Sequence, residues 1–497
     1  MQSVRALLKS HSFYVLGFIG LIIYVSFRAA YVNLTHDEAW SFHNINKFWH
    51  VEFLCSGNSH WFNSLAMKIS ILLGSENIFC LRWFSIFSFI ITCGTGLLFL
   101  KSLENNIVKL FAFCIIFLNP YVLDYFGMAR GYAGGIMFQS LALVFFIKGL
   151  NDKKRFTLFM ALVFSGLSAI SNYSFVYFYF SFCIIYFFTQ YFRTGRSFLR
   201  NKLFYFDLLF SLSIAALIIR AFIFILKCSG DVVGAGEPSF LLMFNVFWDG
   251  LTYYKYFFSP GTQSILSFLV FSLIAASLYV GIFRKRSHHS DVYFYTASIL
   301  AIMIFTMVFN FFGFGVVFPF YRSAQLLFIP SFISIICLLN YFIQRKNSFK
   351  YIGNTISFLL ILNFAFSANF KFCFDFKEQA ECGICFDLVK DLNAKHVGIS
   401  PELYGVFYNY HQSSSTKKYP FLGESINTHF PKGKAKKGDK LSEFDYLILF
   451  PPYNLTYYHN TEISVSPVYL SPVTRTLILK VEKKPRSNNT PGLHKQT

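Results

Sequence analysis

The sequence begins with a long apolar run, FYVLGFIGLIIYVSFRAAYV at residues 13–32, and the polar stretch THDEAW follows at residues 35–40. The run has the length of one membrane-crossing helix, which needs about 20 apolar residues. We interpret it as an uncleaved anchor, because no secretory cleavage site follows it. The polar stretch then places two adjacent carboxylates, Asp37 and Glu38, at the predicted membrane surface. Residues 1–368 hold only 12 acidic residues, and charged groups near hydrocarbon persist mainly when they are paired, hydrated or used.

The composition extends this interpretation to most of the chain. Of the 497 residues, 55% are hydrophobic, 21% aromatic and only 14% charged, and the mean hydropathy is +0.48. These values exclude an ordinary soluble globule and predict an all-α polytopic membrane protein of about eleven transmembrane helices. The predicted spans are 13–33, 78–100, 107–123, 133–149, 156–171, 173–192, 204–226, 263–283, 291–312, 323–344 and 350–368. The arms at 156–192 also fit a hairpin that does not fully cross.

The distribution of Lys and Arg predicts the orientation. One set of alternate loops carries 18 of the 27 basic residues before residue 369, and short cytoplasmic loops are the ones enriched in these residues. The N-terminus is therefore predicted to be cytoplasmic, with Asp37, Glu38 and the tail from residue 369 outside. Nucleic-acid binding is excluded, because the basic residues are scattered over these turns instead of forming one patch.

Two domains are predicted, a membrane part at 1–368 and a soluble extracytoplasmic tail at 369–497. Helical periodicity at 381–395 and strand-like runs at 396–400, 444–450 and 474–481 make the tail a small α/β domain. Residues 432–440 are predicted to form a polar loop, and 485–497 to be disordered. Three tail cysteines, Cys373, Cys382 and Cys385, lack a partner pair with zinc-site spacing. They fit either one disulfide with an odd thiol or a reduced trio.

Basic residues also gather at the predicted outer ends of the spans, and one of them, Arg220, interrupts an apolar run. An Arg at membrane depth is a functional hypothesis by default. Together with Asp37 and Glu38, such cations suit a lipid phosphate held beside an acidic catalytic group. The alternative is that each Arg reaches to lipid headgroups or closes an outer loop by an ion pair. The set is Arg28, Arg130, Arg220, Lys227, Lys255 and Arg322.

Four short motifs occur in order along this predicted outer face. They are Asp37-Glu38; His60-Trp-Phe-Asn63, which leads on to Gly74 and Arg82; Met128-Ala-Arg-Gly-Tyr132; and Tyr321-Arg322, with Pro330 eight residues on. With these motifs the chain resembles the GT-C superfamily of polyprenyl-phosphate-dependent glycosyltransferases. It looks most like the bacterial protein-mannosyltransferase and aminoarabinose-transferase branch, over most of 13–345. Met128 departs from the family, where Glu is frequent, and Asp124 lies one helical turn earlier; the Tyr321-Arg322 order is also reversed.

The resemblance implies an integral-membrane inverting glycosyltransferase. It would move a sugar from a polyprenyl-phosphate donor to a hydroxyl of a glycan, lipid or protein, outside a bacterial inner membrane. Asp37 is the candidate general base, and Glu38 would hold a metal, orient the acceptor or pair with an Arg. The donor phosphate would be bound by Arg130, Arg220, Lys227, Arg322 and Tyr321. His36, His60, Asp124 and Tyr132 are accessory candidates. A divalent metal is left open, with Glu38 and His60 as its candidate ligands.

Two other classes compete with this one. An O-antigen ligase, polymerase or flippase would also handle lipid-linked sugars. A ligase would not need the Asp37-Glu38 pair directly after the first span, and a flippase should carry mid-membrane charges on several helices. A binding or scaffold protein that acts through its tail is the third class, and the tail shows no recognisable ligand motif.

Overall fold

The computed structural model describes residues 12–48, 60–195, 202–229, 236–237, 239–252, 260–283, 290–319, 321–415, 422–425, 441–451 and 463–483. The chain divides into two compact units. The membrane unit comprises Met1–Tyr31 and Asn44–Phe370, and the tail unit comprises Val32–His43 and Lys371–Thr497. The predicted loop 432–440 and the predicted disordered end 485–497 lie outside the described residues. The division into a catalytic membrane domain and a soluble tail stays a prediction.

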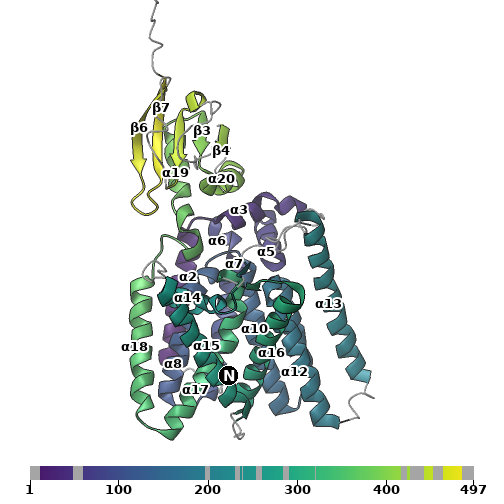
Figure 1. Ribbon diagram of the computed structural model, residues 1–497. Coiled ribbons are helices and arrows are strands. Elements are labelled where there is room, and N and C mark those ends of the chain that lie inside the picture. The colour runs from purple at the N-terminus through teal and green to yellow at the C-terminus, as the bar shows by residue number, and fades with distance from the viewer. Residues whose placement is uncertain are drawn as a thin grey trace, which may run out of the picture. The chain divides into compact units, whose positions relative to one another are not determined.

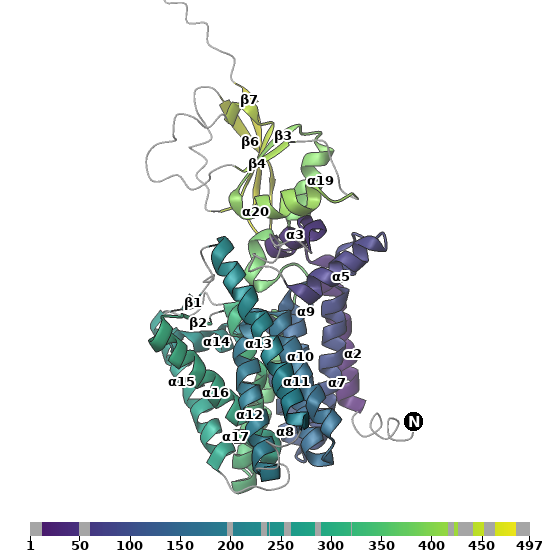
Figure 2. The same ribbon diagram turned by 90° about the vertical axis from the view of Figure 1, so that its right-hand side faces the viewer.

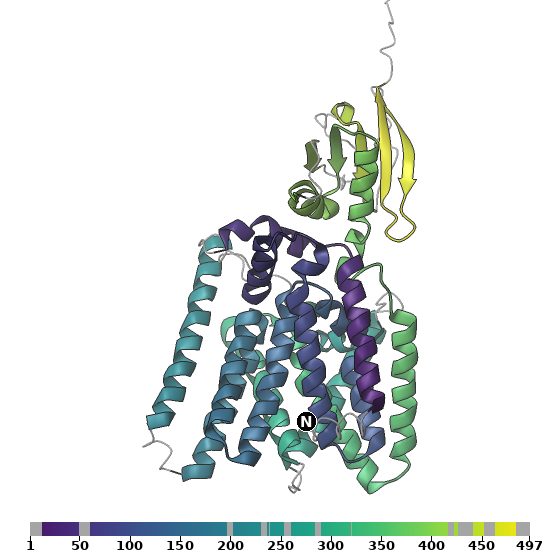
Figure 3. The same cartoon turned by 180° about the vertical axis from the view of Figure 1, so that it is seen from behind.

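The membrane unit is a bundle of long helices that lie side by side (Figures 1 and 2). Views from opposite sides place α13 at one edge of this bundle and α18 at the other (Figures 1 and 3). The long helices are α2 (Ser12–Tyr31), α7 (Trp83–Ser102), α10 (Gly131–Asp152), α11 (Arg155–Ser171), α12 (Val176–Thr194), α13 (Lys202–Ser229), α15 (Pro260–Phe283), α16 (Ser290–Phe314), α17 (Phe328–Arg345) and α18 (Phe349–Ser367).

Shorter elements complete the described part of the membrane unit. They are η1 (Ile45–Lys47), α5 (Trp61–Leu72), α6 (Ile78–Leu81), α8 (Asn106–Phe117), α9 (Pro120–Phe126), η2 (Tyr173–Phe175), η4 (Leu242–Phe244), α14 (Asn245–Thr252) and η6 (Tyr321–Leu327). A two-residue antiparallel pair joins β1 (Gly236–Glu237) to β2 (Phe318–Pro319).

All eleven predicted spans fall on helices. Within the described ranges, nine helices are long and apolar enough to cross a membrane, and the pair α8–α9 makes a tenth if it counts as one span. The remaining segment, α11, has 17 residues. This was the short arm for which the sequence left a hairpin open. The polytopic all-α fold class is confirmed.

One predicted span, 107–123, is not a continuous helix. The structure bends it by 56° between α8 and α9. Pro120 opens α9, where its missing N–H costs nothing, and it cannot continue the hydrogen bonding of α8. The side chain of Asn119 caps the new helix by accepting hydrogen bonds from the backbone N–H groups of Tyr121 (3.1 Å) and Val122 (3.2 Å). The bend therefore has a local cause in the dipeptide Asn119-Pro120.

Small residues allow close helix packing in the bundle, as is typical of membrane proteins. Gly96 on α7 faces the ring of Phe117 on α8, and a Cβ built on Gly96 would lie 2.2 Å from Phe117 Cζ. Gly94, two residues earlier on the same helix, has nothing within 4 Å of its built Cβ. The two glycines therefore form a matched pair, one at a close contact and one in open space.

We expect Gly96→Ala to destabilise the protein by about 1–3 kcal/mol, the usual cost when an added carbon forces a packed ring to shift. Gly94→Ala should be neutral or slightly stabilising, because Ala is the better helix former by about 0.5–1 kcal/mol. Thermal unfolding of the two variants in the same detergent measures the difference. Equal unfolding temperatures for both variants would show that α7 and α8 do not meet at Gly96.

A charged cluster joins three helices elsewhere in the bundle. Asp207 on α13 is buried and accepts a hydrogen bond from the hydroxyl of Tyr186 on α12 (2.7 Å). Arg155, the first residue of α11, forms an ion pair with Asp207 and donates to the Tyr186 hydroxyl (2.7 Å). Arg155 neutralises the buried carboxylate and Tyr186 donates a hydrogen bond to it. Burial of the carboxylate without such partners would be costly. The cluster thus fixes α11, α12 and α13 to one another.

The tail unit is a five-stranded mixed sheet with helices beside it (Figure 2). Its strands run in the order β4 (Leu422–Ser425), β3 (His396–Ile399), β5 (Tyr446–Leu449), β7 (Leu477–Lys483), β6 (Ile463–Leu470). Strand β3 is parallel to both neighbours, and the pairs β5–β7 and β6–β7 are antiparallel. Its helices are α3 (His36–His43), η7 (Phe374–Gln379), α19 (Cys382–Asp391), α20 (Pro401–Val406), η8 (Phe407–Gln412) and η9 (Leu441–Glu443).

Side chains alternate across this sheet as strand geometry requires. Ile448 and Ile478 pack with α19 and α20 on one face. Leu447 and Leu479 face the other side, where they pack with Leu441 and residues of β6. The three predicted strands correspond to β3, β5 and β7, and the predicted helix corresponds to α19. The small C-terminal α/β region is therefore confirmed, with two further strands that the sequence did not reveal.

Candidate active site

The acidic pair lies on the short helix α3, whose start is built by a capping box. Thr35 Oγ1 accepts a hydrogen bond from the N–H of Glu38 (3.3 Å), and Glu38 Oε2 accepts one from the N–H of Thr35 (2.9 Å). This reciprocal pattern satisfies two backbone donors that a helix start otherwise leaves open. The sequence Thr-His-Asp-Glu is therefore itself a helix-start signal. Glu38, fully buried, has a structural task in addition to any chemical one.

Asp37 sits in the first turn of α3 and is only 6% exposed. A carboxylate in this position is favoured by the partial positive charge of the helix N-terminus. The next turn is closed by Ser41, whose hydroxyl donates to the backbone carbonyl of Asp37 (3.1 Å). The helix thus holds the Asp37 backbone in a defined place.

Residues more than 340 positions later in the sequence anchor this helix within the tail unit. Gln379 Oε1 accepts a hydrogen bond from the backbone N–H of His36 (2.6 Å), and the Gln379 carbonyl accepts one from the Asn33 side chain (3.1 Å). Asn33 Oδ1 also lies 3.2 Å from Nε2 of His411. At the other end of α3, the ring of Phe42 packs edge-on against Tyr410 on η8, with centroids 5.2 Å apart. The position of the acidic pair is therefore set by the tail unit.

His36 is exposed, and its ring lies against the backbone of Gly405 on α20. A Cβ on Gly405 would lie 1.8 Å from His36 Nδ1, so only glycine allows this approach. The side chain of His36 therefore packs on α20, while its backbone is held by Gln379.

Beside Gln379, Glu378 is half-buried within the tail unit. Burial raises the pKa of Glu378 above its usual value near 4.5, and the charges of Asp375 and Glu402 raise it further. A raised pKa means that folding favours the protonated acid. The protonated Glu378 therefore contributes to the free energy of unfolding. This stabilisation is fully present below the ordinary pKa and is lost as the pH rises through the raised pKa. The segment that holds α3 is thus weakened by Glu378 at neutral pH.

We expect Glu378→Gln to stabilise η7 at pH 7 and to flatten the loss of stability above pH 4.5. Hydrogen exchange of the segment 374–379 in the full-length protein, measured across this pH range, is the readout. Glu443→Gln, on η9, is the matched control and should leave the profile of η7 unchanged. An identical pH dependence in wild type and Glu378→Gln would contradict the assignment.

In the membrane unit, the central feature is a buried ion pair between α2 and α9. Arg28 Nη2 lies 2.5 Å from Asp124 Oδ1, and both side chains are at most 2% exposed. Arg28 also donates hydrogen bonds to the hydroxyl of Tyr24 (3.3 Å) and to the backbone carbonyl of Asn369. The candidate accessory residue Asp124 is therefore engaged with Arg28 in this structure.

Two further arginines lie close to this pair. Arg82, at the junction of α6 and α7, is fully buried, and its Nη1 donates to the carbonyl of Ala29 (3.2 Å). Arg130 caps the start of α10 and is 2% exposed. Its backbone N–H donates to the carbonyl of Met128 (2.9 Å), which also accepts from the hydroxyl of Ser85 (2.5 Å). The structure thus brings the predicted Arg130 into one buried region with Arg28 and Arg82, which we call the arginine cluster.

The predicted His60 and Tyr132 also come together next to Arg130. His60 is the N-cap residue of α5, and its ring centroid lies 5.9 Å from that of Tyr132. Tyr132 packs in turn against Tyr125 at 4.9 Å. Gly131 permits this packing, because a Cβ there would lie 2.6 Å from His60 Nδ1 and 2.0 Å from the Ser171 carbonyl. Both predicted residues are buried parts of the same end of the bundle.

The other predicted phosphate ligands lie on α13 and η6. Arg220 is exposed on α13 and lies over the ring of Phe224, 5.7 Å from its centroid. Lys227 is exposed in the last turn of α13. Arg322 is half-buried at the start of η6, and the side chain of Tyr321 and the whole of Lys255 lie outside the described residues. The exposure of Arg220 fits the alternative stated above, in which an arginine reaches outward to lipid headgroups.

The metal and cysteine hypotheses can be compared with the same structure. Within the ranges that the structure describes, no group of three or more His, Cys, Asp or Glu side chains could hold a metal ion. Cys373, Cys382 and Cys385 are all buried thiols, which is the reduced alternative. Burial raises the pKa of Cys385 to about 12, so its reactive thiolate form is suppressed.

Sequence reasoning undervalued Arg28 and Arg82. Arg28 was grouped with the basic residues at span ends, and Arg82 was only part of a quoted motif. A usable signal was present, because each stands inside or beside a long apolar run where an unpaired charge is costly. What the sequence could not supply was the partner, since Asp124 is 96 residues from Arg28.

We expect Asp124→Ala to destabilise the protein by about 3–5 kcal/mol, because it leaves the Arg28 charge buried without its carboxylate. The double variant Arg28→Met with Asp124→Leu should recover most of that loss. Thermal unfolding in detergent is the measurement. The control Glu482→Ala removes the partner of Lys480 in an exposed ion pair and should leave the unfolding temperature unchanged. A single variant as stable as wild type would argue against the buried pair.

Comparison with known proteins shows which solved structures this fold is similar to. No protein-family model matches the sequence, and no curated protein matches it. Among solved structures, the chain is similar to ArnT from Cupriavidus metallidurans bound to undecaprenyl phosphate, with a TM-score of 0.51 and 9% identity. That match covers 94% of this chain and 98% of ArnT. The apo form of the same ArnT matches with a TM-score of 0.41 and 9% identity, over 95% of this chain and 98% of that one.

The likeness extends over nearly the whole chain and therefore concerns the complete fold. The protein is an integral membrane protein whose polytopic fold is similar to that of ArnT. The polytopic fold that the sequence resemblance implies is confirmed.

Proposed function

We propose that this protein is an integral-membrane inverting glycosyltransferase that uses a polyprenyl-phosphate sugar as its donor. The acceptor is a hydroxyl of a glycan, a lipid or a protein. The reaction takes place on the extracytoplasmic side of a bacterial inner membrane, with the N-terminus in the cytoplasm.

The observation that carries this proposal is the whole-chain likeness to a structure of ArnT bound to undecaprenyl phosphate. The acidic pair at Asp37 and Glu38 and the arginine cluster supply the two kinds of group that such a transfer needs. Neither feature alone would be sufficient, since buried arginines and helix-capping acids also occur in proteins without catalytic activity.

In the proposed reaction, the acceptor oxygen forms a bond to C1 of the sugar while the bond from C1 to the phosphate oxygen breaks. Asp37 takes the proton of the acceptor hydroxyl, and the polyprenyl phosphate leaves with the bonding electron pair. One displacement inverts the configuration at C1. General-base help of this kind contributes about 10²–10⁴-fold.

The leaving phosphate gains negative charge, which guanidinium groups stabilise by paired hydrogen bonds. We assign this role to Arg130 and Arg322, with Tyr321, Arg220 and Lys227 as further candidate donors. Among the buried arginines, Arg28 is engaged with Asp124, and we therefore give it a structural role. His60 and Tyr132 shape the surroundings of Arg130.

Glu38 takes a structural role in this proposal, because its carboxylate closes the capping box of α3. A Gln side chain fits the same box, whereas Ala does not. Glu38→Gln therefore removes the charge and keeps the cap. This substitution separates the capping role from metal binding or acceptor orientation, which both need the carboxylate.

Asp37→Asn should lower transfer by about 10²–10⁴-fold, because the amide cannot accept the acceptor proton. Glu38→Gln should keep most of the activity. The assay is transfer in reconstituted membranes from a panel of radiolabelled polyprenyl-phosphate sugars, with and without EDTA. The matched control is Asp391→Asn, an exposed acid of the tail unit, which should behave as wild type.

The outcomes separate the competing classes. Label transfer that depends on Asp37 from one donor would support the class and identify the sugar, and EDTA would report any metal requirement. A loss for Glu38→Gln as large as that for Asp37→Asn would give Glu38 a charged role. If folded wild-type protein turned over no donor, a ligase, polymerase or flippase that handles lipid-linked sugars would become the better hypothesis.

A further inference from the structure

A cavity of about 340 Å³ lies among the helices of the membrane unit, and no residue of the arginine cluster lines it. It is enclosed by side chains of α7, α8, α10, α16 and α17. Its volume falls in the range of small-molecule sites in proteins. None of the residues assigned to the proposed reaction lines it.

The interior of the cavity is suited to hydrocarbon. Its inner walls are largely aliphatic or aromatic, with Phe117, Leu143, Ile329 and Ile333 among them. Two of the threonine hydroxyls in the lining are satisfied by their own helix, since Thr92 donates to the Ser88 carbonyl (2.8 Å) and Thr95 to the Thr92 carbonyl (2.8 Å). In the described lining, no buried polar atom lacks a hydrogen-bond partner.

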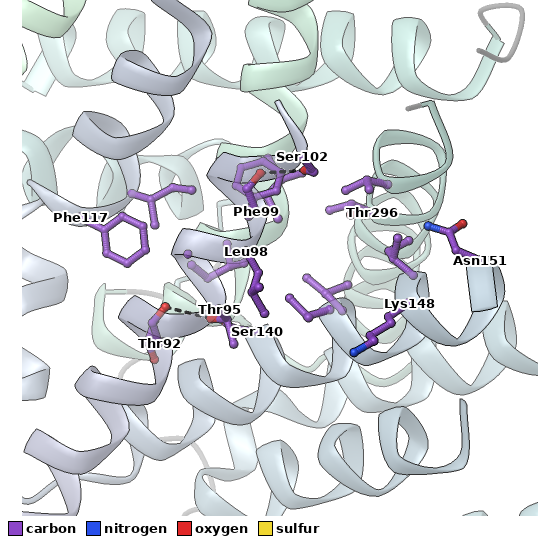
Figure 4. A pocket seen from close by; sticks show the side chains of 18 of the residues that line it. Thr92, Thr95, Leu98, Phe99, Ser102, Phe117, Ser140, Lys148, Asn151 and Thr296 are labelled. Carbon is purple, nitrogen blue, oxygen red and sulfur yellow. Dashed lines mark hydrogen bonds between the residues drawn. The ribbon is translucent and has the colours of Figure 1, made fainter. Parts of the chain in front are cut away.

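The mouth of the cavity is polar, unlike its interior. Four exposed polar residues line it, namely Ser102 on α7 and Lys148, Asn151 and Asp152 on α10. Figure 4 shows Ser102 and Phe99 across the cavity from Lys148 and Asn151. Lys148 and Asp152 are one helical turn apart, which separates their Cβ atoms by about 6 Å. Across the described part of the chain, neither takes part in an ion pair. An ammonium and a carboxylate thus flank the mouth side by side.

From this arrangement we propose that the cavity binds one acyl chain of a zwitterionic glycerophospholipid with a primary ammonium headgroup. The acyl chain occupies the apolar interior. Lys148 binds the phosphate, and Asp152 and Asn151 accept hydrogen bonds from the ammonium. The two charges of an ethanolamine headgroup are separated by two carbons, a short span that a Lys and Asp pair one turn apart can match.

Charge complementarity selects this lipid over its relatives. A purely anionic headgroup would meet Lys148 but would be repelled by Asp152 and by the carbonyl ends of α7 and α10, which carry partial negative charge. A choline headgroup has no N–H to donate to Asp152 or Asn151. Of the three headgroups, only ethanolamine combines a phosphate for Lys148 with N–H donors for Asp152.

The test uses the full-length protein in vesicles that contain one photoactivatable phospholipid. Three probes carry the same diazirine acyl chain and differ only in an ethanolamine, choline or glycerol headgroup. Peptide mapping after illumination should find label on α7, α10, α16 and α17 at the lining residues. The ethanolamine probe should label these helices more strongly than the other two.

Lys148→Gln and Asp152→Asn should each lower this labelling about threefold, the worth of one exposed charge interaction. The matched control Lys346→Gln changes an exposed lysine at the end of α17 that does not line the cavity, and it should have no effect. Ser140→Phe places a ring inside the cavity and should stop labelling of the lining. If Ser140→Phe fails to fold, the two mouth variants still decide the question.

Three outcomes would overturn the proposal. Equal labelling by the ethanolamine and choline probes would remove the role of Asp152. Strongest labelling by the glycerol probe would make the site anionic-lipid binding instead. Label spread over the exposed outer faces of α13 and α18, with none at the lining residues, would show that the acyl chain does not enter. Transfer activity is not the readout, so failure here leaves the proposed function untouched.

Discussion

The buried ion pair of Arg28 and Asp124 is the interaction on which the architecture of the membrane unit depends. It joins the end of α2 to α9, the short helix created by the bend at Asn119-Pro120. A charge pair with so little access to water persists only when its geometry and its other hydrogen bonds are good. Tyr24 and the Asn369 carbonyl supply those bonds to Arg28. The pair therefore fixes where α2 ends, and so where the chain leaves the bundle to form α3.

Two kinds of polar constraint act in the two units. In the membrane unit, buried arginines, Asp124 and Asp207 are matched by partners from other helices, because an apolar environment tolerates little else. In the tail unit, the side chains of Asn33, Gln379 and Glu38 form hydrogen bonds with backbone groups, and these bonds define the start of one short helix. The cap and these contacts hold the start of α3, and with it the backbone of Asp37 and Glu38, in one position.

The sequence predicted those features that depend on local pattern. Each of the eleven apolar runs is helical, although 107–123 is divided between α8 and α9, and the three central strands of the tail sheet match predicted strands. The two missed strands, β4 and β6, are the edges of that sheet. Edge strands carry polar residues and Pro, such as Ser464, Ser466 and Pro467, and therefore lack the apolar signature. Asp37 and Glu38 were found because acids are scarce before the tail. Their anchoring by Gln379 and the partner of Arg28 could not be found, because both depend on contacts between distant parts of the chain.

The tail unit is discontinuous, since Val32–His43 belongs with Lys371–Thr497. During synthesis, α3 emerges early, and its packing partners Gln379, Tyr410 and His411 follow more than 300 residues later. At about 5–20 residues per second, this interval lasts on the order of 15–65 s. Because an eight-residue helix has little stability alone, the acidic pair would stay unstructured until the tail is complete. The membrane bundle can thus be inserted and assembled before the acidic pair on α3 is organised.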